Sequence, residues 1–128
     1  MTRVLLVGYA PDSVDFSDTA LPPGLDAGKI AAGIDLGLRQ MRDRGWQTDF
    51  CSILPDDTAT GTVARHLAAA RYDCVVIGGG VRMSSDGLER FEAVVNAVRE
   101  GAPHAPIAFN TRPDDSADAA ARWLGISA

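Results

Sequence analysis

The chain has 128 residues, 46% of them hydrophobic and 23% charged, which fits one folded domain and excludes a second domain or intrinsic disorder. No apolar run approaches the roughly 20 residues of a membrane-spanning helix. The net charge of −5 argues against binding nucleic acid through its phosphates. The first residues show no secretory signal pattern. We therefore expect one cytoplasmic domain over residues 1–128, with no nucleic acid or membrane as partner.

Four segments of the chain predict β-strands. Residues 3–8 and 73–78 are continuous apolar runs of strand length, typical of strands that are covered on both faces. The segment 46–54 is more polar, which predicts a strand at an edge of the sheet. Residues 106–109 predict a short fourth strand.

Apolar residues at helical spacing lie between these strands. The first helix is predicted over residues 27–44, with Asp26 as its N-terminal cap and Gly45 just past its end. Two further helices are predicted over 58–70 and 116–124.

Another helix is predicted to begin at Asp86 and to end at Gly101. Asp86 and Glu89 have the spacing of a capping box, in which two side chains satisfy the first free amides of a helix. The face of this helix that we expect to be buried carries Leu88, Phe91, Val95 and Val98.

This alternation of strands and helices predicts an α/β domain of three layers, a four-stranded parallel sheet of order 2-1-3-4 with helices on both faces. The architecture resembles flavodoxin-like and receiver-like doubly wound domains. Receiver domains carry paired acids after the first strand and a phosphoacceptor aspartate after the third, where this chain has Gly8-Tyr9 and Gly78. Thr111 matches the receiver hydroxyl position. The resemblance therefore implies the fold without the phosphorylation site.

Several short segments are also similar to short uncharacterised bacterial proteins. They comprise residues 15–18, 21–24, 72–78 and 109–113, which are spread over most of the chain. This resemblance implies a bacterial protein and brings no activity with it.

Ligands of doubly wound sheets bind beyond the carboxyl ends of the strands, where the strand order reverses. In the order 2-1-3-4 this point lies between the first and third strands, beside the loop that follows the fourth. The candidate ligand-binding residues in these loops are Gly8, Tyr9, Asp12, Gly78, Gly79, Gly80, Arg82, Asn110, Thr111 and Arg112.

The three consecutive glycines at 78–80 are the most informative feature of these loops. Glycines permit a positive φ and a close approach of the backbone to a ligand. The helix start that follows them favours an anion, and Arg82 and Arg112 could hold a carboxylate or a phosphate. The alternative is a tight turn in which the following serines cap the helix.

Motifs for cofactors and catalysis are missing. The glycine run lacks the third glycine of G-x-G-x-x-G, and the chain has neither a P-loop nor a G-x-S-x-G elbow. Cys51 and Cys74 are expected at opposite ends of the sheet, too far apart for a disulfide. His66 and His104 lack the spacing of a metal site. We therefore predict no cofactor and no metal site, and catalysis remains open.

The segment from residue 9 to 25 is longer than the usual connection from a strand to a helix, and it contains Asp12, Asp15 and Asp18. One interpretation is a flap that closes over the site. Another is a compact loop that its own apolar side chains pack over the end of the sheet. The aspartates could also recruit a hard cation such as Mg²⁺ or Ca²⁺.

These features together predict a protein that binds a small anionic or polar ligand at the carboxyl end of the sheet. The alternative is a non-catalytic, receiver-like interaction module. The fourth strand leaves an open sheet edge that no charge or bulge guards, which predicts a homodimer built around residues 106–109 or the last helix.

Overall fold

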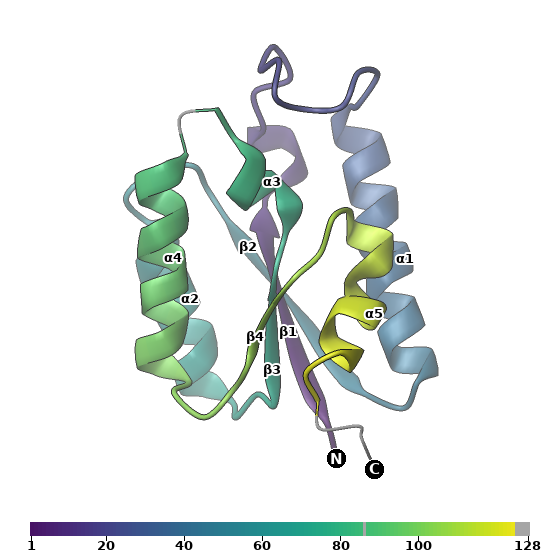
Figure 1. Cartoon of the computed structure of the whole chain (residues 1–128), viewed down its shortest axis with the longest axis vertical. Helices are drawn as coiled ribbons and strands as arrows, with labels where there is room; N and C mark the ends of the chain where they lie inside the picture. Colours follow the sequence, from purple (N-terminus) through teal and green to yellow (C-terminus); the bar gives the residue numbers. More distant parts are fainter. Residues whose placement is uncertain (86, 125–128) are drawn as a thin grey trace.

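The computed structural model describes residues 1–85 and 87–124. At its centre is a four-stranded, all-parallel sheet in the order β2-β1-β3-β4, which confirms the predicted topology (Figure 1). The strands are β1 (Arg3–Tyr9), β2 (Gln47–Ile53), β3 (Cys74–Ile77) and β4 (Ile107–Phe109).

Helices cover both faces of the sheet and complete the three predicted layers (Figure 1). One face carries α2 (Ala59–Ala69) and α4 (Leu88–Gly101), and the other carries α1 (Ala27–Asp43) and α5 (Ser116–Ala121). Three short helical segments lie in the connections: η1 (Pro11–Ser13), α3 (Gly79–Met83) and η2 (Pro113–Asp115).

The side chains of β1 alternate between two apolar cores, one under each helical layer. Leu5 and Val7 pack into the core beneath α2 and α4, whereas Leu6 packs into the core beneath α1 and α5. Because helices cover both faces of β1 and β3, residues 4–7 and 74–77 are all buried. This double burial explains why both strands are continuous apolar runs in the sequence.

Both ends of α1 follow local signals in the sequence, as predicted. The Asp26 carboxylate accepts a hydrogen bond from the backbone amide of Lys29 at 2.8 Å and so caps the helix start. Gly45 follows the last turn with a φ of +86°, a conformation that glycine adopts without a steric penalty.

The parallel register brings the ends of three strands together. Val7 of β1 lies beside Ile77 of β3, and Ile77 lies beside Phe109 of β4. The loops after these strands therefore leave the sheet along one edge. β1 and β3 are neighbours there, so this edge is the point where the strand order reverses.

The predicted buried face of α4 is wrong at its first residue. Leu88 is 69% exposed, whereas Val94 and Val98 are buried. The six-residue separation of Leu88 and Val94 places their side chains about 120° apart around the helix, so Leu88 points away from the core. The predicted cap at Asp86 lies outside the described residues.

The segment after β3 is a short helix, α3, where the sequence predicts a loop. Among the described residues a positive φ occurs at Gly24 and Gly45, so none of the three glycines at 78–80 needs one. Two of them pack closely instead: a Cβ on Gly78 would lie 3.1 Å from the Val7 carbonyl oxygen, and a Cβ on Gly79 would lie 2.8 Å from the Met83 methyl carbon and 3.1 Å from the Thr111 carbonyl oxygen.

Candidate functional site

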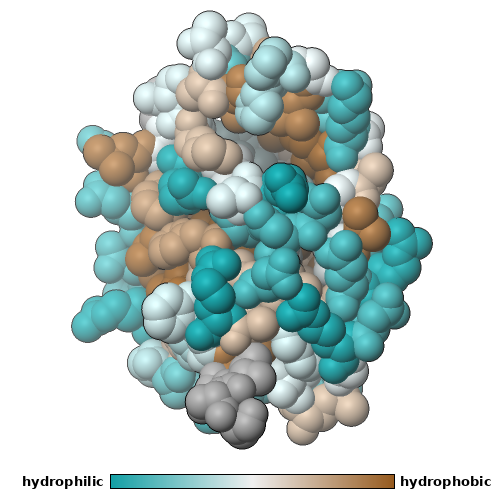
Figure 2. All heavy atoms as spheres, turned by 45° about the vertical axis from the view of Figure 1, so that its right-hand side comes forward, coloured by the Kyte–Doolittle hydropathy of each residue, from teal (hydrophilic) through white to brown (hydrophobic). Residues whose placement is uncertain are grey.

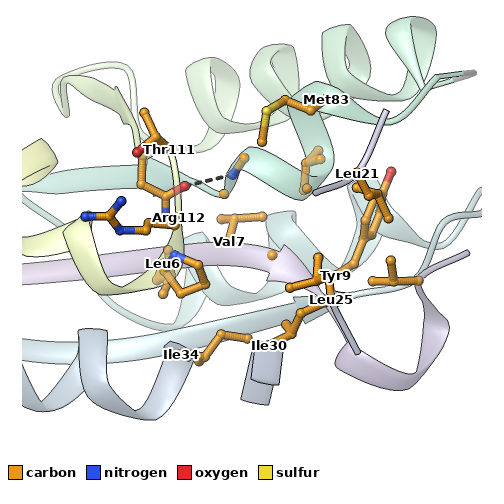
Figure 3. A pocket seen from close by; sticks show the side chains of 18 of the residues that line it. Leu6, Val7, Tyr9, Leu21, Leu25, Ile30, Ile34, Met83, Thr111 and Arg112 are labelled. Carbon is orange, nitrogen blue, oxygen red and sulfur yellow. Dashed lines mark hydrogen bonds between the residues drawn. The ribbon is translucent and has the colours of Figure 1, made fainter. Parts of the chain in front are cut away.

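A cavity of about 150 Å³ lies where β1 and β3 end, between the start of α1, the short helix α3 and the loop after β4 (Figure 3). At the same end of the molecule, the space-filling view shows apolar side chains around a hollow (Figure 2). The strand-order rule thus leads to a cavity that the structure contains.

Most of the predicted site residues line this cavity. They are Gly8, Tyr9, Gly78, Gly79, Gly80, Asn110, Thr111 and Arg112. Asp12 and Arg82 do not belong to the lining, since Asp12 is exposed in η1 and the Arg82 guanidinium donates a hydrogen bond to the Asn110 carbonyl at 2.8 Å. The structure therefore brings the three predicted loops together but leaves two of their charged side chains outside.

The cavity walls are largely apolar, which the sequence did not predict. Ile30 and Ile34 of α1, Phe50 of β2 and Met83 of α3 line it, together with Leu21 from the long loop. Apolar spacing marks such residues as core. Spacing cannot separate a side chain that packs against a neighbour from one that faces an empty space.

Asn110 connects the glycine segment to α5. Its side-chain oxygen accepts a hydrogen bond from the Gly79 amide at 2.7 Å, and its side-chain nitrogen donates to the Ser116 hydroxyl at 2.9 Å. Ser116 in turn donates to the Pro113 carbonyl at 2.7 Å. Both ends of the buried Asn110 side chain already have partners, so its role is to hold α3 against the start of α5. The Gly79 amide already donates to Asn110 and is therefore not free to bind a ligand.

Two basic side chains line the cavity and one of them was not predicted. Lys29 donates from Nζ to the Gly24 carbonyl at 2.6 Å. Arg112 is 71% exposed and pairs through Nε with the Asp114 carboxylate at 2.9 Å. Of the two arginines predicted to hold an anion, Arg112 lines the cavity and Arg82 does not, so the positive charge at the cavity comes from Lys29 and Arg112. Lys29 lies in the first turn of α1, which passes beside the strand ends. Its place at the start of the predicted helix could therefore have identified it as a site residue.

Tyr9 lines both this cavity and a second, more polar one of about 240 Å³, which Asp15 and Asp18 of the long loop also line. Tyr9 is only 7% exposed, and its hydroxyl has no hydrogen-bond partner among the described residues. Its ring extends toward Leu21 of the long loop (Figure 3). A buried hydroxyl without a partner costs about 1–3 kcal/mol, so a polar ligand atom or a water bound there would stabilise the protein.

The Asp18 carboxylate fastens the long loop to the other side of the site. Asp18 accepts hydrogen bonds from the backbone amide of Ser85, at 2.9 Å, and from the Ser85 hydroxyl. The hydrogen bonds from Ser85 lower the pKa of Asp18 below its ordinary value. Ser85 lies in the segment between α3 and α4, 67 residues away in the sequence.

Both cysteines are free and fully buried. Burial raises the pKa of the Cys51 thiol to about 11 and that of Cys74 to about 12. At neutral pH both are therefore protonated thiols, which are poor nucleophiles. Neither cysteine lines the cavity, and the same holds for His66 and His104.

Within residues 1–85 and 87–124, no three His, Cys, Asp or Glu side chains stand close enough together to hold a metal ion. No helix in that part of the chain has the length and apolar character needed to cross a membrane. A comparison of the chain with protein families, with curated proteins and with solved structures finds no match.

Proposed function

We propose that this protein binds a small ligand with an apolar body and an anionic or polar end in the cavity between β1 and β3. The observation that carries the proposal is the cavity itself, which combines apolar walls with two cationic side chains. Lys29 and Arg112, which both line the cavity, favour a ligand that carries a negative charge. The walls favour a hydrocarbon body.

The volume of the cavity limits the size of that body. Drug-sized ligands occupy pockets of about 300–1,000 Å³, whereas an engineered apolar cavity of about 150 Å³ in another protein binds benzene. The cavity here has the latter size, about 150 Å³. A single ring or a short branched chain therefore fits, and a nucleotide does not.

Binding of three ring compounds tests this proposal. Benzoate, benzyl alcohol and benzylamine share a ring and differ in the charge at the end. We expect affinity to fall in that order, with dissociation constants between about 1 μM and 1 mM, because so few atoms make contact. Calorimetry or chemical-shift titration measures each affinity.

A substitution that fills the cavity provides the matched control. Ile30→Trp should fill the space and weaken benzoate binding at least tenfold. Ala32→Trp lies on the exposed face of α1 and should leave binding unchanged. Absence of binding by all three compounds, or equal binding by the two variants, would overturn the proposal.

The alternative function, a homodimeric interaction module, also has an observation in its favour. Apolar side chains remain uncovered on the edge strand β4 and at the start of α4: Phe109 is 36% exposed and Leu88 is 69% exposed. The Phe109 ring lies 5.7 Å from that of Phe91, one helical turn after Leu88. Patches of this kind mark interaction surfaces when they are contiguous.

The structure corrects one premise of the dimer prediction. The edge of β4 is guarded in part, because Arg122 donates from Nη2 to the Phe109 carbonyl at 3.0 Å. A partner strand could therefore reach fewer free backbone groups than the sequence suggests. Sedimentation velocity at micromolar concentration tests the dimer: a single species of monomer mass would contradict it.

A further inference from the structure

The loop between β1 and α1 forms one side of the cavity. Its residues Val14, Leu21, Pro22 and Leu25 belong to the lining. In the close view, Leu21 and Leu25 lie with Tyr9 at one end of the cavity (Figure 3). If this loop moved away, that end would lose most of its apolar wall.

The loop is anchored at both ends. At its start, the Ala10 amide donates to the Ile53 carbonyl at 2.9 Å, which continues the pairing of β1 with β2. At its end, Lys29 donates to the Gly24 carbonyl at 2.6 Å. Gly24 has a φ of +79°, a conformation that allows the sharp change of direction there.

Between these anchors the loop is built from local turns. Asp15 accepts hydrogen bonds from the amide and hydroxyl of Ser17, and Asp18 accepts one from the Ala20 amide. Such turns shape the loop but do not connect it to the rest of the protein. Asp18 and Ser85 connect the loop to the other side of the site.

The Asp18–Ser85 contact has the properties of a reversible connection. It consists of two charge-assisted hydrogen bonds, which hold a loop more firmly than neutral ones. It is also exposed to solvent, so water can replace either bond when the contact opens.

We propose that residues 10–25 are a lid over the cavity and that the Asp18–Ser85 contact is its latch, whose release sets the rate at which ligands enter and leave. This inference rests on the proposed function only for the chemical nature of the ligand. The opening of the lid can nevertheless be measured without any ligand.

A cysteine placed in the cavity wall reports lid opening. Val81 lines the cavity and is completely buried, so Val81→Cys provides a thiol that iodoacetamide can reach only when the cavity opens. The native Cys51 and Cys74 are also completely buried, away from the cavity lining. Their labelling in the same sample reports global unfolding, and mass spectrometry of peptides separates the three sites.

Two loop carboxylates form a matched pair for this measurement. Asp18→Ala and Asp15→Ala each remove one charge and one local turn from the lid, but only Asp18→Ala breaks the contact with Ser85. Added to Val81→Cys, Asp18→Ala should speed labelling of the cavity thiol about five- to tenfold. Asp15→Ala should change it by less than about twofold. Labelling of Cys51 and Cys74 should stay slow in both.

Amide exchange measured by NMR on the protein with native Val81 gives a second readout should Val81→Cys disturb folding. If the cavity thiol is labelled equally fast in Asp18→Ala and Asp15→Ala, and amide exchange is also equal, the proposal that the Asp18–Ser85 contact is a latch is wrong.

Benzoate kinetics separate this inference from the proposed function. In Asp18→Ala, both the association and the dissociation rate of benzoate should rise if lid and ligand proposals both hold. Faster thiol labelling in Asp18→Ala without any benzoate binding would support the lid and contradict the proposed class of ligand. If benzoate binds with equal association and dissociation rates in Asp18→Ala and Asp15→Ala, the cavity is a binding site but the Asp18–Ser85 contact is not a latch.

Discussion

Adjacent glycines can have different roles, and Gly79 and Gly80 show this at the scale of single residues. A Cβ on Gly79 would meet the Met83 methyl and the Thr111 carbonyl, whereas a Cβ on Gly80 would have no atom within 4 Å. Gly79→Ala should lower the free energy of unfolding by about 1–3 kcal/mol through overpacking. Gly80→Ala should raise it by up to about 1 kcal/mol, because alanine favours the helical conformation of α3. Urea denaturation measures the free energy of unfolding of both variants. Equal changes in the two would contradict the prediction that the glycines have different roles.

The Asp18 carboxylate predicts how the latch depends on pH. Hydrogen bonds from Ser85 hold the pKa of Asp18 below its ordinary value of 3.8. The charged form therefore stabilises the folded state fully above that value, and the contribution is lost as pH falls through the lowered pKa. The latch should stay intact from about pH 5 to pH 8.

An NMR titration of the Ser85 amide measures this directly. Its inflection should lie below pH 3.8 and should disappear in Asp18→Ala, while Asp15→Ala should leave it in place. An inflection at or above the ordinary value would show that the hydrogen bonds do not favour the charged form.

At the scale of elements, α1 packs against η2 through a glycine. A Cβ on Gly37 would overlap the Pro113 carbonyl oxygen, which is backbone and cannot rotate away. Gly37→Ala should therefore destabilise the protein by about 2–3 kcal/mol. Since Pro113 and Arg112 line the cavity, benzoate affinity should fall as well.

Gly61 on α2 provides the control for this prediction. A Cβ added to Gly61 would lie 3.7 Å from its nearest neighbour, a nitrogen at the end of the Arg65 side chain. Gly61→Ala should stabilise the helix by up to about 1 kcal/mol and leave benzoate binding unchanged. Thermal unfolding and benzoate titration of both variants test the pair. Similar stability of Gly37→Ala and Gly61→Ala would mean that α1 and η2 can move apart freely.

At the scale of the whole molecule, the uncovered side chains on β4 and at the start of α4 predict how a dimer would be disrupted. Leu88→Lys should convert a dimer to monomer, because it places a charge in the apolar patch. Leu54→Lys is the matched control, since Leu54 is 45% exposed but follows β2, the opposite edge of the sheet. Sedimentation velocity compares the two, and loss of the dimer in both would place the interface elsewhere.

The prediction from sequence succeeded where the signals are local. Double burial makes residues 4–7 and 74–77 continuous apolar runs, which identifies the two central strands. The more polar segment at residues 46–54 was predicted at an edge, and β2 at residues 47–53 lies there. The location of the cavity follows from strand order alone. Its chemical character does not, because Ile30 and Phe50 have the same pattern whether they face a neighbour or a cavity.

The sequence by itself determined the parallel sheet, its strand order, the caps of α1 and the end of the sheet at which the cavity lies. The strands and caps follow from periodicity and from contacts within a few residues, whereas the strand order and the end of the sheet follow from the general rules for doubly wound sheets. Only the tertiary structure decided that Asn110 holds Gly79 and that Asp18 holds Ser85, across 31 and 67 residues. Such contacts arise when separate loops meet at the end of the sheet, and no local preference of the chain specifies which side chains then come within hydrogen-bonding distance.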